Sequence, residues 1–107
     1  MASNQYRFTE IAKKDLDSVL NYIFNDLCNP LAAQNFFEEV TKAIQRILVF
    51  PKSYPLVNNE FLSKKDIRKA VIDNYILYYS FDIELHLITI LRIVYGSRNL
   101  ERVLKYI

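Results

Sequence analysis

The sequence predicts an α+β domain in which a helical hairpin packs on one face of an antiparallel sheet, with the elements in the order β-α-α-β-β-β. From Ala12 to Leu48, apolar residues recur at steps of three and four, which is the spacing of one buried helix face. From Arg68 to Val94, short runs rich in Ile, Val, Leu and Tyr alternate with polar turns, as in antiparallel strands. The apolar stripe that the two helices share needs a sheet to cover it, so the two layers are expected to pack together.

The first strand is expected at Tyr6 to Phe8, and the first helix follows it directly. Thr9 is a suitable N-cap because its hydroxyl can accept a hydrogen bond from a free amide of the first turn. The helix should end near Asp26. Its apolar face comprises Ala12, Leu16, Val19, Leu20, Ile23 and Leu27.

The second helix has clear sequence signals at both ends. Asn29 can cap it, and Pro30 has the fixed φ and missing N–H that suit the first helical position. The helix should run to Phe50, because the ring of Pro51 disfavours a helical conformation in the residue before it. The shared core of the two helices and the sheet is expected to contain Leu16, Leu20, Phe37, Val40, Ile44, Ile90 and Leu91.

The C-terminal half predicts three strands after a loop from Lys52 to Lys65. The strands are expected at Arg68 to Ile72, Tyr75 to Phe81 and Leu85 to Val94. The last run is apolar on both faces, which is typical of a strand in the centre of a sheet. Gly96 ends it, and a short helical turn is expected within Asn99 to Tyr106.

Composition places the chain among cytoplasmic globular proteins. Its 107 residues, 51% hydrophobic and 24% charged, fit a single domain over residues 1–107. The sequence contains no apolar run of the roughly 18 residues that a membrane span needs, and its polar start, MASNQYRFTE, does not resemble a secretory signal. One cysteine excludes an internal disulfide. We therefore expect a cytoplasmic protein with no membrane partner.

The positive charge lies entirely in the C-terminal half. Up to Asn59 six basic residues balance six acidic ones, whereas from Glu60 onward eight basic residues face six acidic ones. The basic residues of this half are Lys64, Lys65, Arg68, Lys69, Arg92, Arg98, Arg102 and Lys105. They form either a solvated face or a patch that meets a polyanion or an acidic partner.

No catalytic motif stands out. His86 has no ligand-type neighbours and is interpreted as a partly buried structural residue within a strand, Cys28 is interpreted as a packing residue, and Glu38-Glu39 as exposed charge. With one glycine in the chain, there is no phosphate-binding loop. We expect no cofactor and no metal. The tyrosines on the predicted sheet are either half-buried filler or an interface, namely Tyr75, Tyr78, Tyr79 and Tyr95.

The order of the elements and several short segments resemble the RelE/ParE toxin superfamily, and most closely its ParE branch, from Tyr6 to Leu104. The matching segments are Ala12-Lys13-Lys14-Asp15-Leu16, Tyr22-Ile23, Asn29-Pro30-Leu31-Ala32-Ala33, Leu48-Val49-Phe50-Pro51, Arg68, Tyr75-Ile76-Leu77-Tyr78-Tyr79 and Ile90-Leu91-Arg92-Ile93-Val94-Tyr95-Gly96-Ser97-Arg98-Asn99. Family members often carry a glycine after the helix-ending proline, where this chain has Ser53-Tyr54-Pro55. This departure bears on the loop conformation only.

The resemblance implies the toxin of a type II toxin–antitoxin module, of the kind that stabilises plasmids, neutralised by a cognate antitoxin encoded beside it. ParE-like members are reported to poison DNA gyrase, whereas RelE-like members cut mRNA in the ribosome. Resemblance to the RelE-like enzymes would place Arg98 at the phosphate. Their companion tyrosine and strand arginine match Leu104 and Val71 here, and neither of these side chains can transfer a proton or stabilise charge.

The resemblance therefore favours a non-enzymatic gyrase inhibitor that contacts its target through Arg92, Arg98 and Arg102. The alternative is a ribosome-dependent endoribonuclease, in which the catalytic groups would be Arg98, Arg68, Lys64 and Lys65. The excess of tyrosine and the basic C-terminal half predict an acidic, amphipathic antitoxin segment that wraps the helical hairpin or adds to a sheet edge. The antitoxin-binding residues themselves are not predicted.

Overall fold

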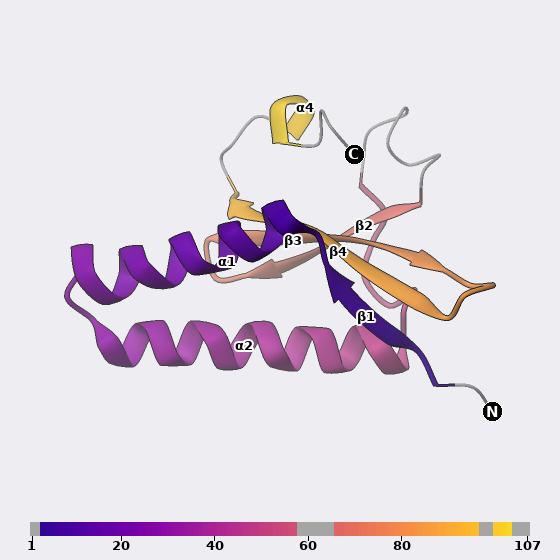
Figure 1. The fold of residues 1–107 in the computed structure, drawn as a ribbon, viewed down its shortest axis with the longest axis horizontal. Coiled ribbons are helices and arrows are strands. Elements are labelled where there is room, and N and C mark those ends of the chain that lie inside the picture. Colours follow the sequence, from indigo (N-terminus) through magenta and orange to yellow (C-terminus); the bar gives the residue numbers. More distant parts are fainter. Residues whose placement is uncertain (1–2, 58–65, 97–99, 104–107) are drawn as a thin grey trace.

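The computed structural model describes residues 3–57, 66–96 and 100–103, and its elements follow the predicted order (Figure 1). They are β1 (Gln5–Phe8), α1 (Glu10–Asn21), the π-helical segment η1 (Tyr22–Asp26), α2 (Pro30–Val49), β2 (Ile67–Ile72), β3 (Tyr75–Asp82), β4 (Leu87–Tyr95) and the short helix α4 (Leu100–Val103). The predicted α+β class is confirmed. No helix among these residues is long and apolar enough to cross a membrane.

Both long helices begin at the predicted caps. The Thr9 hydroxyl accepts a hydrogen bond from the Ala12 amide at 3.1 Å, and the Asn29 side-chain oxygen accepts one from the Ala32 amide at 3.1 Å. These bonds satisfy amides that a helix leaves without partners in its first turn. The first helical run reaches Asp26 as expected, because η1 continues α1 without a break.

The sheet has the strand order β1-β4-β3-β2 and is mixed rather than antiparallel throughout. Strands β2, β3 and β4 form the predicted antiparallel meander, but β1 pairs with β4 in parallel, with Gln5 opposite Leu87 and Phe8 opposite Ile90. The helical hairpin accounts for the difference. It carries the chain away from the sheet and back, so that β2 runs in the direction of β1, and β4 recovers that direction after two hairpin turns (Figure 1).

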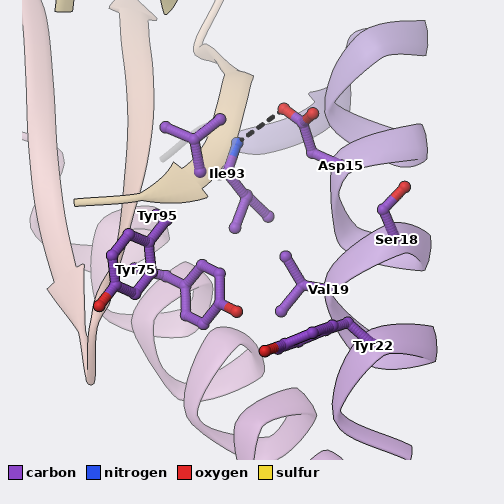
Figure 2. Close-up of a pocket in the computed structure, with 8 residues that line it drawn as sticks. Asp15, Ser18, Val19, Tyr22, Tyr75, Ile93 and Tyr95 are labelled. Carbon is purple, nitrogen blue, oxygen red and sulfur yellow. Dashed lines mark hydrogen bonds between the residues drawn. The ribbon is translucent and has the colours of Figure 1, made fainter. Parts of the chain in front are cut away.

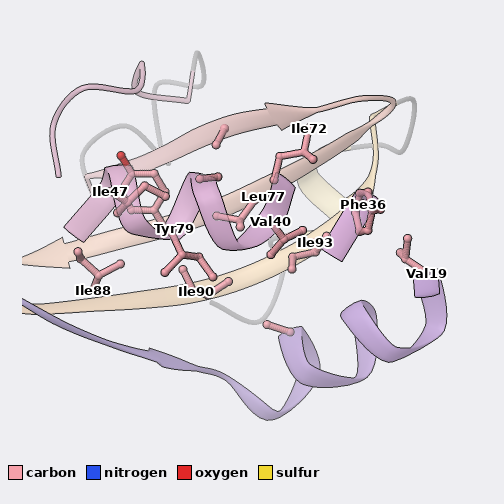
Figure 3. Close-up of a cluster of buried hydrophobic side chains, with 14 of the residues drawn as sticks. Val19, Phe36, Val40, Ile47, Ile72, Leu77, Tyr79, Ile88, Ile90 and Ile93 are labelled. Atoms are coloured by element: carbon pink, nitrogen blue, oxygen red, sulfur yellow. The ribbon is translucent and has the colours of Figure 1, made fainter. Parts of the chain in front are cut away.

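The helical hairpin covers one face of the sheet and forms the main core. Figure 3 shows this core, which contains Phe36, Val40 and Ile47 of α2 against Leu77, Tyr79, Ile88, Ile90 and Ile93 of the sheet. Of the predicted core residues, Val40, Ile44 and Ile90 are buried here, and Leu16 and Leu20 pack against this cluster. The predicted position of Phe37 is wrong. Its ring is 50% exposed because the buried stripe of α2 runs through Phe36 instead.

A second, smaller cluster of buried side chains is formed by the loop after α2, strands β2, β3 and β4, and helix α4. It contains Val57, Ile67, Tyr78, Leu91, Val94 and Val103. Leu91 was predicted to lie in the core shared with the helices, and a β-bulge explains why it does not. Tyr79 pairs with Ile90 while Tyr78 pairs with Arg92, so Leu91 is an extra residue and the alternation of side chains changes phase there. As predicted, β4 is central and is buried on both faces.

Strand β4 begins two residues later than predicted. The Asp82 carboxylate accepts a hydrogen bond from the Leu85 amide at 3.1 Å, which closes a turn of the type that Asp side chains favour. His86 then adopts a left-handed φ of 52°. The prediction that His86 is a partly buried strand residue is therefore wrong, since its side chain is exposed in the β3–β4 turn.

Candidate functional site

The predicted site residues that the structure describes are Arg68 on β2, Arg92 on β4 and Arg102 on α4. Lys64, Lys65 and Arg98 lie outside the described residues. The structure brings Arg92 and α4 together, because the Arg92 guanidinium donates to the main-chain oxygen of Val103 at 2.9 Å. Arg68 contacts a different part of the chain, the loop that follows α2.

Arg92 forms a bidentate ion pair with a residue that sequence reasoning did not single out. Its Nε and one terminal nitrogen donate to the two carboxylate oxygens of Asp15 at 2.7 and 3.1 Å. The Asp15 carboxylate also accepts from the Ile93 amide at 3.1 Å, the bond drawn in Figure 2. The side chains of Arg92 and Asp15 are only 13% and 14% exposed. Charges this sheltered are stable only when such partners replace water.

The Asp15–Arg92 pair lies where β1 no longer covers the edge of β4. Strand β1 ends at Phe8. Beyond that point the edge of β4 is bound by side chains: the Thr9 hydroxyl donates to the Leu91 oxygen, and the Asp15 carboxylate accepts from the Ile93 amide. Arg92 thus joins α1, β4 and α4, and it positions the helix that carries Arg102. The role of Arg92 as a direct target contact stays a prediction, whereas its internal contacts are enough to explain an arginine at this position.

Arg68 holds the loop after α2 against the sheet. Its guanidinium donates to the main-chain oxygens of Tyr54 at 2.7 Å and Lys52 at 3.3 Å, and lies 3.6 Å from the Asp66 carboxylate. Among the described residues, the Arg68 Nε is a buried nitrogen without a hydrogen-bond partner. Both loop carbonyls accept from the same terminal nitrogen, Nη1, and the side chain of Arg68 is only 13% exposed.

Tyr79 links the loop after α2 to the core by a hydrogen bond. Its ring is fully buried, and its hydroxyl donates to the Pro51 oxygen at 2.7 Å. Burial raises the pKa of Tyr79 to about 12, although the neighbouring Arg68 lowers it in part. Because an ionised phenol is poorly solvated in the core, the folded state strongly favours the neutral hydroxyl.

This shift predicts a loss of stability at high pH. The contribution of the neutral Tyr79 hydroxyl to the stability of the folded state is complete below the ordinary tyrosine pKa of 10.0. It is lost as the pH rises toward about 12, because the unfolded chain releases this proton at a lower pH than the folded chain. We expect Tyr79→Phe to lower the free energy of unfolding by about 1 kcal/mol at pH 7, because the hydrogen bond is lost. Above pH 10, the free energy of unfolding of the variant should fall less steeply with pH than that of the wild type. Urea midpoints measured across this pH range would show both effects.

Tyr6→Phe is the matched control for this measurement, because Tyr6 is 49% exposed and the variant should keep wild-type stability at pH 7. Burial also raises the pKa values of Tyr75 and Tyr78, so part of the decline should remain in the Tyr79→Phe variant. Parallel curves for wild type and Tyr79→Phe above pH 10 would contradict this account of the buried hydroxyl.

A pocket of about 520 Å³ opens between α1 and the end of β4 (Figure 2). Tyr22, Tyr75 and Tyr95 surround it together with Asp15 and Ser18. Burial raises the pKa of Tyr75, with further contributions from Tyr22 and Tyr95. The tyrosines of β3 and β4 therefore divide into two groups: Tyr78 and Tyr79 are buried, whereas Tyr75 and Tyr95 line an accessible pocket.

The other residues interpreted from the sequence are Cys28 and the pair Glu38-Glu39. Cys28 was predicted to be a packing residue, which is wrong: it is exposed, has a left-handed φ of 50° and donates its thiol to the Asn25 oxygen. Glu38 and Glu39 are exposed on α2 as predicted. Across residues 3–57, 66–96 and 100–103, no group of three or more His, Cys, Asp or Glu could hold a metal ion.

Comparison with known proteins gives one family match and several similar solved structures. Residues 6–100 match the family described as the ParE toxin of the type II toxin–antitoxin system parDE. No curated protein sequence matches the chain. A structure of the chromosomal ParDE system from P. aeruginosa is similar with a TM-score of 0.68 and 15% identity, covering 89% of this chain and 98% of that one. The RelBE2 toxin–antitoxin complex of Mycobacterium tuberculosis gives a TM-score of 0.50 and 19% identity, covering 88% and 99%.

Proposed function

The chain belongs to the ParE toxin family of type II toxin–antitoxin systems, and from that premise we propose that it arrests growth by inhibiting DNA gyrase through protein contact. In this proposal a cognate antitoxin neutralises it, and it acts in the cytoplasm, where gyrase and DNA are found. The two similar structures belong to a ParDE system and a RelBE2 complex, which supports an antitoxin as partner. Binding alone is sufficient for such inhibition, and no proton transfer is required.

The engagement of Arg68 is the observation that most favours gyrase inhibition over mRNA cleavage. A metal-free nuclease needs cationic groups free to neutralise a phosphate, as well as groups that transfer protons. The Arg68 guanidinium is bound to two loop carbonyls, and that of Arg92 to Asp15 and Val103. Val71, at the position of the strand arginine expected in RelE-like enzymes, presents an apolar side chain that is 67% exposed. Of the four residues predicted for a nuclease, the structure describes only Arg68, and its guanidinium is bound within the fold.

Arginine at a protein surface is suited to binding a target. Arg102 lies on α4 with an exposed side chain, and α4 is held in place by the contact between Val103 and Arg92. Arginine is favoured at protein interfaces because its planar guanidinium both stacks and donates several hydrogen bonds. We propose that Arg102 and Arg98 contact the target, while Arg92 positions the helix that carries Arg102.

The proposal predicts growth arrest that the neighbouring gene relieves. Induced expression of the chain in a bacterial host should stop colony formation, and co-expression of the reading frame adjacent to its gene should restore it. Toxin levels are matched by immunoblot in both strains, because lower expression alone would also restore growth. Arrest that is equal with and without the adjacent gene would contradict the proposed pairing.

A further inference from the structure

A hollow surface at the C-terminal end of α2 combines apolar and basic side chains. It comprises Arg46, Val49 and Phe50, the adjoining Lys52, and Ile83 and His86 of the β3–β4 turn, around a cavity of about 860 Å³. We call this the α2-end surface. It lies apart from the tyrosine-lined pocket and from the Arg92 contacts, which are at the other end of β4.

The apolar part of the α2-end surface is largely exposed. Val49, Phe50 and Ile83 are 68%, 61% and 63% exposed, and all three line the same cavity. Single exposed apolar residues are ordinary, but a contiguous group rimmed by polar residues is typical of a protein-binding surface. Covering these three side chains would remove apolar area from water, which favours association.

The polar rim of this surface is basic. Arg46 and Lys52 contribute cations and His86 an imidazole, and none of the described residues that line the cavity is acidic. The Arg46 guanidinium lies 5.7 Å from the centre of the Tyr54 ring, a cation–π distance that holds it near the cavity. The carboxylates closest in sequence to Ile83 are those of Asp82 at the end of β3, which is bound to the Leu85 amide, and of Glu84, and neither lines the cavity.

We propose that the α2-end surface is a docking site for an amphipathic helix of the antitoxin, with apolar side chains on one face and carboxylates beside them. The apolar face would cover Val49, Phe50 and Ile83, and the carboxylates would pair with Arg46 and Lys52. This inference rests on the proposed toxin function. Helix-in-groove binding of this kind uses apolar anchors for affinity and rim charges for orientation and association rate.

Two other cavities fit such a partner less well. The pocket at the tip of the helical hairpin is lined by Leu20, Phe24, Phe37 and uncharged polar residues, so it offers no charge to select a partner. In the tyrosine-lined pocket, the Asp15 carboxylate is already bound to Arg92 and Ile93. Of these three cavities in the described part of the chain, the one at the α2-end surface joins exposed apolar side chains to cations.

The test measures binding of the full chain to the purified product of the adjacent reading frame, by calorimetry at two salt concentrations. We expect Phe50→Ser to raise Kd by about 10- to 100-fold, as for the loss of a central apolar anchor. Lys52→Glu should also weaken binding, and by more at low salt than at high salt, because salt screens the charge pairing. Thermal melts establish that each variant is folded.

Matched controls carry the same substitutions elsewhere on the surface. Phe37→Ser removes a half-exposed ring at the hairpin tip, and Lys14→Glu reverses an exposed charge on α1, so both should bind like wild type. If Phe37→Ser weakens binding and Phe50→Ser does not, the docking site is misplaced while the toxin function stands. If Phe50→Ser binds the antitoxin normally but no longer inhibits gyrase, the surface serves the target, which also overturns the proposal.

Failure of the proposed function gives a different pattern. In that case wild-type chain would not arrest growth and would not bind the adjacent gene product at all, so the variants would show no difference. Binding by wild type that Phe50→Ser and Lys52→Glu both weaken, with unchanged controls, is the result that the proposed docking site requires.

Discussion

Asp15→Ala is expected to lower the free energy of unfolding by about 3 kcal/mol, because it leaves a sheltered arginine without its counter-charge. The carboxylate accepts three hydrogen bonds, two from Arg92 and one from the Ile93 amide, and all three are lost together. Among the described residues, the guanidinium keeps its bond to the Val103 oxygen, and its other donors must draw in water. Urea denaturation at neutral pH measures this change directly.

Two comparisons separate the ion pair from general effects of mutation. Asp17→Ala removes an exposed carboxylate from the same helix and should change stability by no more than about 0.5 kcal/mol. Replacing both partners, Asp15→Leu with Arg92→Met, should recover part of the loss, since an apolar pair leaves no unpaired charge. If Asp15→Ala and Asp17→Ala unfold at the same urea concentration, the Asp15–Arg92 pair does not hold the fold together.

The elements that the sequence predicts well are those whose signals are local. Thr9 and Asn29 bind amides three residues further along the chain, so their role as caps can be read from a short segment. The length of α2 follows in the same way from Pro30 and Pro51, which mark its two ends. The apolar character of β4 on both faces likewise indicates a central strand from nine consecutive residues.

The features that the sequence does not predict depend on distant contacts. The Asp15–Arg92 pair joins residues 77 positions apart, and nothing near either residue marks the other as its partner. The parallel pairing of β1 depends on the number of chain reversals between β1 and β4, rather than on the composition of either strand. The bulge at Leu91 is equally hidden, because β4 carries apolar residues on both faces and the change of phase therefore leaves no visible break in the pattern.

The candidate site was predicted only in part for the same reason. Clustering of basic residues in the C-terminal half indicates where arginines lie along the chain, but not which of them are bound internally. Arg68 and Arg92 are both held by main-chain carbonyls and carboxylates from other elements. The α2-end surface was missed because its members come from the end of one helix and a turn some 30 residues later.

The contacts of Arg98 and Arg102 are expected to affect how tightly the target is bound. Loss of a single interface arginine typically weakens association by one or two powers of ten. Arg98→Ala should therefore raise the toxin concentration needed for half-maximal inhibition, and excess protein should still inhibit fully. In a nuclease, loss of the phosphate-binding arginine would instead slow the chemical step by about 10²–10³, which excess protein would not restore.

The most direct measurement adds purified chain to two reactions in parallel: supercoiling of relaxed plasmid by DNA gyrase, and translation of a labelled message by a ribosome extract. A gyrase inhibitor should block supercoiling in a dose-dependent manner and leave the message intact, and Arg98→Ala should shift the dose–response curve without lowering its plateau. The antitoxin, added first, should abolish the inhibition. Cleaved message together with normal supercoiling would contradict the proposed target and would point to Arg98, Lys64 and Lys65 as catalytic groups.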